Sequence, residues 1–220
     1  MVISARLACL LLLTALGAQG CASTAARPEA AAGSTTPSET APAAAAAATG
    51  AEPDKDVMAA LMAGEFAWQD GRSDSAARHY ARAAELSQDP GIAEHATKVA
   101  LSAQQWGVAA DTIARWRALD PKAAGLVQAD AALALGKGET GPAAELLASL
   151  LDQGKAGRRQ AAQALVAAPD RKGAAQVVAD LLARPVLGGG TAALLLLGQV
   201  SEQLGDTALA LRAAESAVAS

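Results

Sequence analysis

The sequence predicts an all-α fold, a right-handed α-solenoid of about five helix–turn–helix repeats. Of the 220 residues, 52% are hydrophobic but only 2% are aromatic, and alanine and leucine dominate. This composition suits many short, closely packed helices and offers little material for strands. Small and aromatic residues also fall at spacings of seven, five, four and three between residues 64 and 83. Similar residues recur further along the chain, as expected of a repeat architecture.

The regular stretch runs from Gly64 to Leu86 and places small residues where two antiparallel helices would touch. Its motif residues are Gly64, Gly71, Ala76, Tyr80 and Ala83. The spacing resembles a tetratricopeptide repeat (TPR), whose period is about 34 residues, with the ring between the helices and Gly71 in the turn. Equivalents of Ala76 follow at steps of 33, 34, 31 and 36 residues, at Ala109, Ala143, Ala174 and Ala210.

Turn and cap residues bound the first repeat, which is predicted from about Asp56 to Pro90. Gly71 is expected to end the first helix in a left-handed C-cap conformation. Ser73 or Asp74 is expected to cap the second helix. Pro90 is expected to stop the chain, because it lacks the N–H that a continuing helix would use.

The second and third repeats are predicted over residues 91–121 and 124–155. Trp116 stands where alanine is usual, so the next helix must either stand off or pack against its ring. In the third repeat, Gly138 occupies the turn.

The fourth repeat, residues 157–185, is shorter and has Pro169 between its helices, with Asp170 as a cap for the second. The fifth restores the pattern with Gly198, Gly205 and Ala210. Repeat arrays usually end in a helix with a polar outer face. None is visible before Ser220, which predicts either a truncated chain or an exposed end that meets a partner.

The first 20 residues are predicted to be an export signal. Arg6 precedes an apolar run over residues 7–16, shorter than the roughly 20 residues that a membrane span needs. The segment resembles a bacterial lipoprotein signal, which implies lipidation of Cys21 and an anchor in the outer membrane. The alternative is ordinary cleavage between Ala18 and Ala22, which would release a soluble periplasmic protein.

Cys21 and the Ala/Ser/Thr/Pro-rich residues up to 55 are predicted to form a lipidated, disordered tether. Such a composition buries too little apolar surface to offset the entropy lost on ordering. The folded repeat domain is therefore expected over residues 56–220.

Two segments, residues 89–97 and 114–121, resemble the opening repeats of Gram-negative TPR lipoproteins, including the adaptor of a periplasmic carboxyl-terminal processing protease. The resemblance implies a scaffold on the periplasmic face of the outer membrane that holds a protease and cell-wall hydrolases together, with no catalytic residue. The alternative is a TPR assembly factor for outer-membrane or pilus and secretion machinery.

Little in the chain predicts chemistry. The net charge of −4 argues against nucleic-acid binding. Both cysteines lie in the first 21 residues, and neither histidine, His79 or His95, has a second ligand at metal spacing. Residues 136–141 satisfy GxGxxG, but between two predicted helices this is expected to be a repeat turn. No enzyme activity, cofactor, metal or small-molecule substrate is predicted.

A protein-binding surface is predicted on the concave face, where the first helices of stacked pairs expose their non-core positions. The sequence contains no asparagine, so the paired Lys and Asn clamp that some TPR domains use for a peptide carboxylate is not expected. A helix or a folded surface is the expected partner. The predicted binding residues are Glu65, Trp68, Gln69, Glu94, Lys98, Leu101 and Gln128.

Overall fold

The computed structural model describes residues 56–184, 187 and 190–220. The chain divides into two units, Met1–Ala48 and Thr49–Ser220, and every described residue belongs to the second. The predicted signal, Cys21 and the predicted tether lie outside the described residues.

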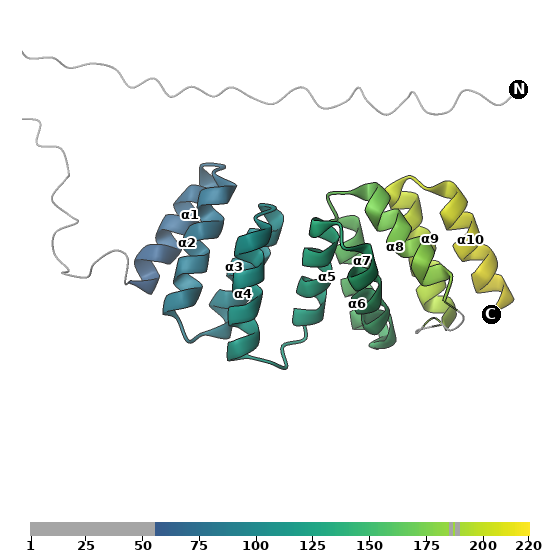
Figure 1. The fold of residues 1–220 in the computed structure, drawn as a ribbon, viewed down its shortest axis with the longest axis horizontal. Coiled ribbons are helices and arrows are strands. Elements are labelled where there is room, and N and C mark those ends of the chain that lie inside the picture. The colour runs from purple at the N-terminus through teal and green to yellow at the C-terminus, as the bar shows by residue number, and fades with distance from the viewer. Residues whose placement is uncertain (1–55, 185–186, 188–189) are drawn as a thin grey trace, which may run out of the picture. The chain divides into compact units, whose positions relative to one another are not determined.

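The described residues form helices and connecting turns, with no strand among them, so the predicted all-α class is confirmed. The helices pack consecutively, each against its neighbours in the chain (Figure 1). They are α1 (Val57–Gln69), α2 (Ser73–Leu86), α3 (Pro90–Ser102), α4 (Trp106–Leu119), α5 (Leu126–Lys137), α6 (Thr140–Asp152), α7 (Gly154–Val166), α8 (Arg171–Leu182), α9 (Gly190–Leu204) and α10 (Thr207–Ala219).

The helices associate as antiparallel pairs, with one exception. In α1/α2, α3/α4, α5/α6 and α9/α10, the two helices pack extensively against each other. Helices α7 and α8 make few contacts with each other, and both pack on α6 instead. Pro169 lies in the connection between them, which differs from the connections in the other pairs.

One left-handed residue turns the chain between the helices of each of those four pairs. Gly71, Gln104, Gly138 and Gly205 have φ values of 72°, 56°, 74° and 89°. The first three are 33 and 34 residues apart, so the backbone repeats with the period that the sequence predicts. The predicted left-handed C-cap at Gly71 is confirmed. Glycine suits three of these turns because it has no Cβ, whereas Gln104 adopts the same conformation with one.

We expect Gln104→Gly to raise the free energy of unfolding by up to about 1 kcal/mol, because relief of a left-handed Cβ gains roughly 1–2 kcal/mol and the added chain entropy of glycine offsets roughly 0.5–1 kcal/mol of that. Urea unfolding followed by circular dichroism measures the change. Gln153→Gly is the matched control, since Gln153 is also a turn residue but has a φ of −81°. The control is expected to lose roughly 0.5–1 kcal/mol from added chain entropy. Equal effects of the two substitutions would contradict the strain at Gln104.

Helix starts agree with the sequence only in part. Asp170 caps α8 as predicted, accepting a hydrogen bond from the Lys172 N–H at 2.9 Å. The predicted cap of α2 is wrong: the helix already begins at Ser73, and the N-cap residue Arg72 makes no side-chain cap bond. Gly71 already forms the turn, so Arg72 is the only residue between the turn and the start of α2. Ser73 is therefore inside the helix and cannot be its N-cap.

Pro90 also acts differently from the prediction. It is the first residue of α3 rather than a stop between repeats, and Asp89 accepts from the Gly91 N–H at 2.8 Å. Proline fits the first position of a helix because no intrahelical bond needs its N–H.

The predicted small positions lie between the helices, except near the end of the array. Gly64 is buried against the ring of Tyr80, and a Cβ on Gly64 would lie 3.0 Å from that ring. The buried alanines are Ala76, Ala83, Ala109, Ala143 and Ala174. Gly198 and Ala210, their equivalents in the last pair, are only partly buried.

The buried side chains form two hydrophobic clusters that divide within α5. One cluster extends from Ala67 of α1 to Ala129 of α5. The other extends from Ala131 of α5 to Leu209 of α10. Helix α5 therefore contributes to both cores: Leu126, Ala129 and Leu133 pack in the first, and Val127, Ala131, Ala134 and Leu135 pack in the second.

At the joint between α4 and α5, tryptophan rings lie against glycines. A Cβ on Gly125 would come within 2.6 Å of the Trp116 ring, and one on Gly136 within 2.4 Å of the Trp106 ring. The prediction that the helix after Trp116 must accommodate its ring is confirmed. Because Gly125 and Gly136 have no side chain, the rings of Trp116 and Trp106 fit into this joint.

Candidate functional site

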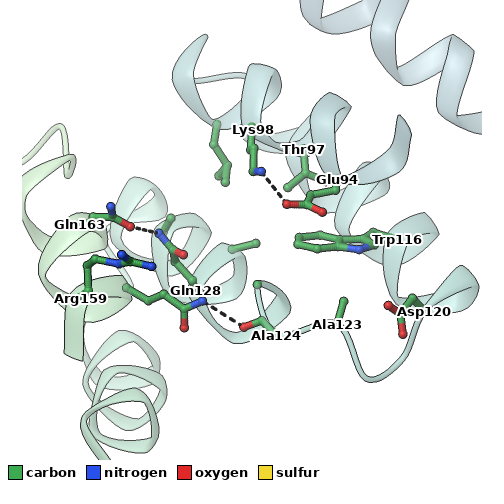
Figure 2. A pocket seen from close by; sticks show the side chains of 15 residues that line it. Glu94, Thr97, Lys98, Trp116, Asp120, Ala123, Ala124, Gln128, Arg159 and Gln163 are labelled. Carbon is green, nitrogen blue, oxygen red and sulfur yellow. Dashed lines mark hydrogen bonds and ion pairs between the residues drawn. The ribbon is translucent and has the colours of Figure 1, made fainter. Parts of the chain in front are cut away.

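Helices α3, α5 and α7 line a groove of about 600 Å³, here called the central groove (Figure 2). They are the first helices of the second, third and fourth predicted repeats. The lining residues are Glu94, Thr97, Lys98 and Leu101 of α3; Trp116 of α4; residues 120 and 123–125 of the connecting loop; Gln128, Ala129 and Ala132 of α5; and Arg159, Gln160 and Gln163 of α7.

The bottom of the central groove is apolar. Trp116 is 4% exposed, and its ring forms one wall beside Ala123 and Ala124 (Figure 2). Ala129 is buried next to it on α5. Side chains of a partner that entered here would leave water for an apolar surface, which favours binding.

Three glutamine amides stand above this apolar surface. The Gln128 Nε2 donates to Gln163 Oε1 at 3.3 Å, and the Gln160 Nε2 donates to the Ala124 carbonyl at 3.4 Å. Both bonds are long and exposed, so they are weak. Each amide offers donors and acceptors of the kind that a peptide backbone needs.

Two anions and two cations line the central groove: Glu94, Asp120, Lys98 and Arg159. Lys98 pairs with Glu94 along α3. Arg159 extends into the groove from α7 (Figure 2), and no carboxylate among the described residues forms an ion pair with it. A free guanidinium binds carboxylates through charge-assisted hydrogen bonds.

The central groove continues into a second hollow of about 420 Å³ along the same helices. Lys98, Leu101, Gln128 and Gln163 border both hollows, and the second extends towards Trp106 and Pro169. The continuous surface thus crosses three helices, which suits an elongated ligand better than a compact one.

The structure brings four of the seven predicted binding residues together. Glu94, Lys98, Leu101 and Gln128 line the central groove. Glu65, Trp68 and Gln69 lie on α1 and do not line it.

The α1 residues include two that already have partners. The Tyr80 hydroxyl donates to Glu65 Oε2 at 2.8 Å, and the Gln69 Nε2 donates to Glu65 Oε1 at 2.8 Å. These two bonds lower the pKa of the exposed Glu65 carboxyl below its usual value. The bond from Gln69 has the larger effect, and the bond from Tyr80 the smaller. Burial, and then the bond to Glu65, raises the pKa of Tyr80 to about 12.

We expect tyrosinate absorbance to titrate with a midpoint of about 12 in the folded chain. Tyr80 is the only tyrosine, so the signal has a single source. In urea the midpoint should return to about 10, the value of a free phenol. Between these pH values only the folded state keeps the proton, so this contribution to stability is complete below about pH 10 and is lost as the pH rises towards 12.

Two variants separate the causes of this shift. Glu65→Gln should lower the midpoint while leaving it above about 10, because burial of the ring persists. Tyr80→Phe should abolish the pH dependence that Tyr80 contributes to the free energy of unfolding. A midpoint near that of a free phenol in the folded wild type would show that the hydroxyl is neither buried nor bonded.

Sequence reasoning missed the contribution of α7. Arg159, Gln160 and Gln163 were not among the predicted binding residues, although Gln163 follows Gln128 by 35 residues and so sits one repeat further on. Applying the repeat period to the fourth repeat would have found it. The irregular pairing of α7 with α8 obscures that period.

The remaining candidates for chemistry have structural explanations. Within the GxGxxG segment, Gly136 accommodates the Trp106 ring and Gly138 is the left-handed cap of α5. The segment spans the end of α5, the turn and the start of α6, and the predicted turn at Gly138 is confirmed. His95 packs edge-on against Tyr80, with ring centroids 4.6 Å apart. Across the described residues, no group of three or more His, Cys, Asp or Glu is placed to hold a metal ion.

No protein-family model matches the chain, and no curated protein matches it. None of the described helices combines the length and the apolar character that crossing a bilayer requires.

Proposed function

We propose that the chain is a protein-binding scaffold rather than an enzyme, and that the central groove takes an extended segment of a partner protein. One observation carries the proposal: amides from two helices and the unpaired Arg159 converge above an apolar wall. The sequence alone favoured a helix or a folded surface. Weakly bonded glutamine amides favour a segment with free backbone groups, since a helix satisfies its own.

The partner segment should carry a carboxylate opposite Arg159. Lys98 and Glu94 neutralise each other in an ion pair, and Asp120 lies on the opposite side of the groove, so Arg159 is the cation on the α7 wall that a partner carboxylate can reach (Figure 2). Small apolar side chains of the segment would contact Trp116 and Ala129. Such a ligand chemistry fits an acidic stretch or a carboxyl terminus.

We expect Arg159→Glu to weaken partner binding roughly tenfold or more, because a hydrogen bond to a charged group contributes about 1.5–3 kcal/mol. Arg158→Glu is the matched control: it makes the same charge change one residue away, and Arg158 lines neither hollow. The full chain serves as bait in an envelope extract, and the affinity of each retained protein is then measured for both variants. A partner that binds both variants equally does not use the groove.

We also propose that the helices form five TPR-like repeats with a right-handed superhelix. The four left-handed turns and the buried alanines at corresponding positions support this repeat assignment. The pair α7/α8 would be a divergent fourth repeat, since its helices separate onto α6.

For the cellular setting we propose a scaffold on the periplasmic face of the outer membrane, anchored through Cys21. The sequence supports this proposal through the apolar run before Cys21 and the low-complexity segment after it. Labelling of cells with a palmitate analogue should reach the wild-type chain and be lost in Cys21→Ala. Labelling that persists in Cys21→Ala would exclude the anchor.

The same extract distinguishes the two proposed classes of partner. A carboxyl-terminal processing protease and cell-wall hydrolases are expected for an adaptor. Outer-membrane barrel or secretin subunits would instead favour an assembly factor.

A further inference from the structure

Helix α1 presents an apolar stripe that nothing in the described chain covers. Met58, Met62 and Phe66 follow one another at intervals of four residues and are all more than half exposed. They lie opposite Ala60, Gly64 and Ala67, the face that is buried. A helix that is apolar all round normally has partners on both sides.

Later repeats show what usually covers this face. By the turn spacing, Met62 and Phe66 correspond to His95 and Val99 of α3, 33 residues on. The His95 ring packs edge-on against Tyr80 of the preceding pair although His95 is still exposed, and Val99 is buried. The turn residues Gly71 and Gly205 are 134 residues apart, so the position of Phe66 corresponds to Val200 of α9, which is also buried. The α3 face therefore contacts the preceding helix pair at His95, and both equivalents of Phe66 are buried.

Helix α10 presents the opposite half of the same interface. Leu211 is 60% exposed and Val218 is 90% exposed. Their equivalents are Ala77 and Ala84 in α2, which are fully buried where α3 packs on α2.

A hollow of about 460 Å³ is bordered by residues of both α9 and α10. Its apolar and small lining residues are Leu195, Gly198, Ala210, Leu211 and Ala214, and its polar ones are Gln199, Glu202 and Thr207. Ala214 occupies the position of Tyr80 in the first pair, so the hollow lies where a large ring stands in α2.

We infer that the two end faces bind each other between copies of this chain, with α1 of one copy packed on the α9/α10 pair of the next. The interface continues one that the chain already forms between α2 and α3, and each copy carries both of its halves. The sizes also match, because the long side chains of Met62 and Phe66 meet a surface hollowed at Ala214. A head-to-tail contact of this kind leaves a free end on every assembly, so assemblies of increasing length form.

The test measures mass by light scattering on the full-length chain in a nonionic detergent, with the protein mass separated from the detergent mass. The wild type is expected to rise from one chain to two and more as its concentration increases. Met62→Glu with Phe66→Glu removes one end face, and Leu211→Glu removes the other. Each variant alone is expected to stay at the mass of one chain.

Mixing the two variants decides the geometry. Each retains one intact end, so the mixture should give a twofold mass and nothing longer. Val166→Glu is the matched control, since Val166 is an exposed apolar residue that belongs to neither end face, and its masses should equal those of the wild type. Circular dichroism must show unchanged helix content in all variants, because the substituted side chains are exposed.

Other results overturn the inference. A wild type that remains a single chain at every concentration excludes self-association. A Leu211→Glu variant that still doubles in mass indicates a symmetric contact through α1 instead. A mixture that stays at the mass of one chain excludes the head-to-tail arrangement. None of these outcomes bears on the central groove, which is formed by other residues.

Discussion

Trp116→Ala is expected to lower the free energy of unfolding by about 3–5 kcal/mol, the usual cost of deleting a buried tryptophan ring. Trp116 is buried in α4, and Gly125 lies against its ring with no side chain that can fill the space left behind. The substitution removes the main apolar contact between α4 and the start of α5. It also removes one wall of the central groove, so partner binding should fall with stability.

Trp68→Ala is the control for the same chemical change. Trp68 is 45% exposed on α1, and surface substitutions usually change stability by less than about 0.5 kcal/mol. Urea unfolding should be followed by circular dichroism, because both variants alter tryptophan fluorescence directly. If the two variants lose similar stability, Trp116 does not hold the joint together.

Gly157→Ala is expected to destabilise the chain by about 1–3 kcal/mol, the range for an overpacked interior. A Cβ at this position of α7 would lie 2.1 Å from the Leu150 carbonyl oxygen and 2.7 Å from the Gln153 Cβ. The obstacle is the backbone of α6, which cannot rotate away as a flexible side chain can. The helices must therefore separate to admit a single methyl group.

The contrasting variant is Gly141→Ala in α6. Gly141 is also helical, but a Cβ there would meet nothing within 4 Å. The substitution should stabilise the chain by about 0.4–1 kcal/mol, because alanine restricts the unfolded chain more than glycine does. The two glycine substitutions are thus expected to have opposite signs in thermal or urea unfolding. Stabilisation by both would mean that α6 and α7 are not in close contact at Gly157.

Local rules predicted much of the fold because they act within a few residues. Gly71 ends α1 in a left-handed conformation, Gly138 lies in a turn and Asp170 caps α8, as the sequence indicated. The start of α2 was misassigned because good capping residues, Ser73 and Asp74, lie just inside the helix. When several residues that could cap a helix lie next to one another, the sequence does not show which of them is the N-cap until the position of the preceding turn is known.

The groove was harder to predict because it depends on which helices face each other. Glu94, Lys98 and Gln128 followed from the repeat pattern, and they do line the groove. Arg159 did not, because α7 lies in the pair that departs from the pattern. Glu65 was expected to be available on the concave face, but hydrogen bonds from Tyr80 and Gln69 engage it. Such side-chain bonds depend on distances between helices that the repeat period does not encode.

The division of the core within α5 has a consequence for binding. The central groove takes Trp116 from one hydrophobic cluster and its α7 wall from a helix packed in the other. Local opening of either half would destroy the groove while leaving the other core folded, so binding competence is lost before the fold is. A bound segment opposes both openings by mass action, by about 2.7 kcal/mol when its concentration is a hundred times its Kd. Occupancy would thereby add a second link between the two hydrophobic clusters, besides the helix α5 that packs in both.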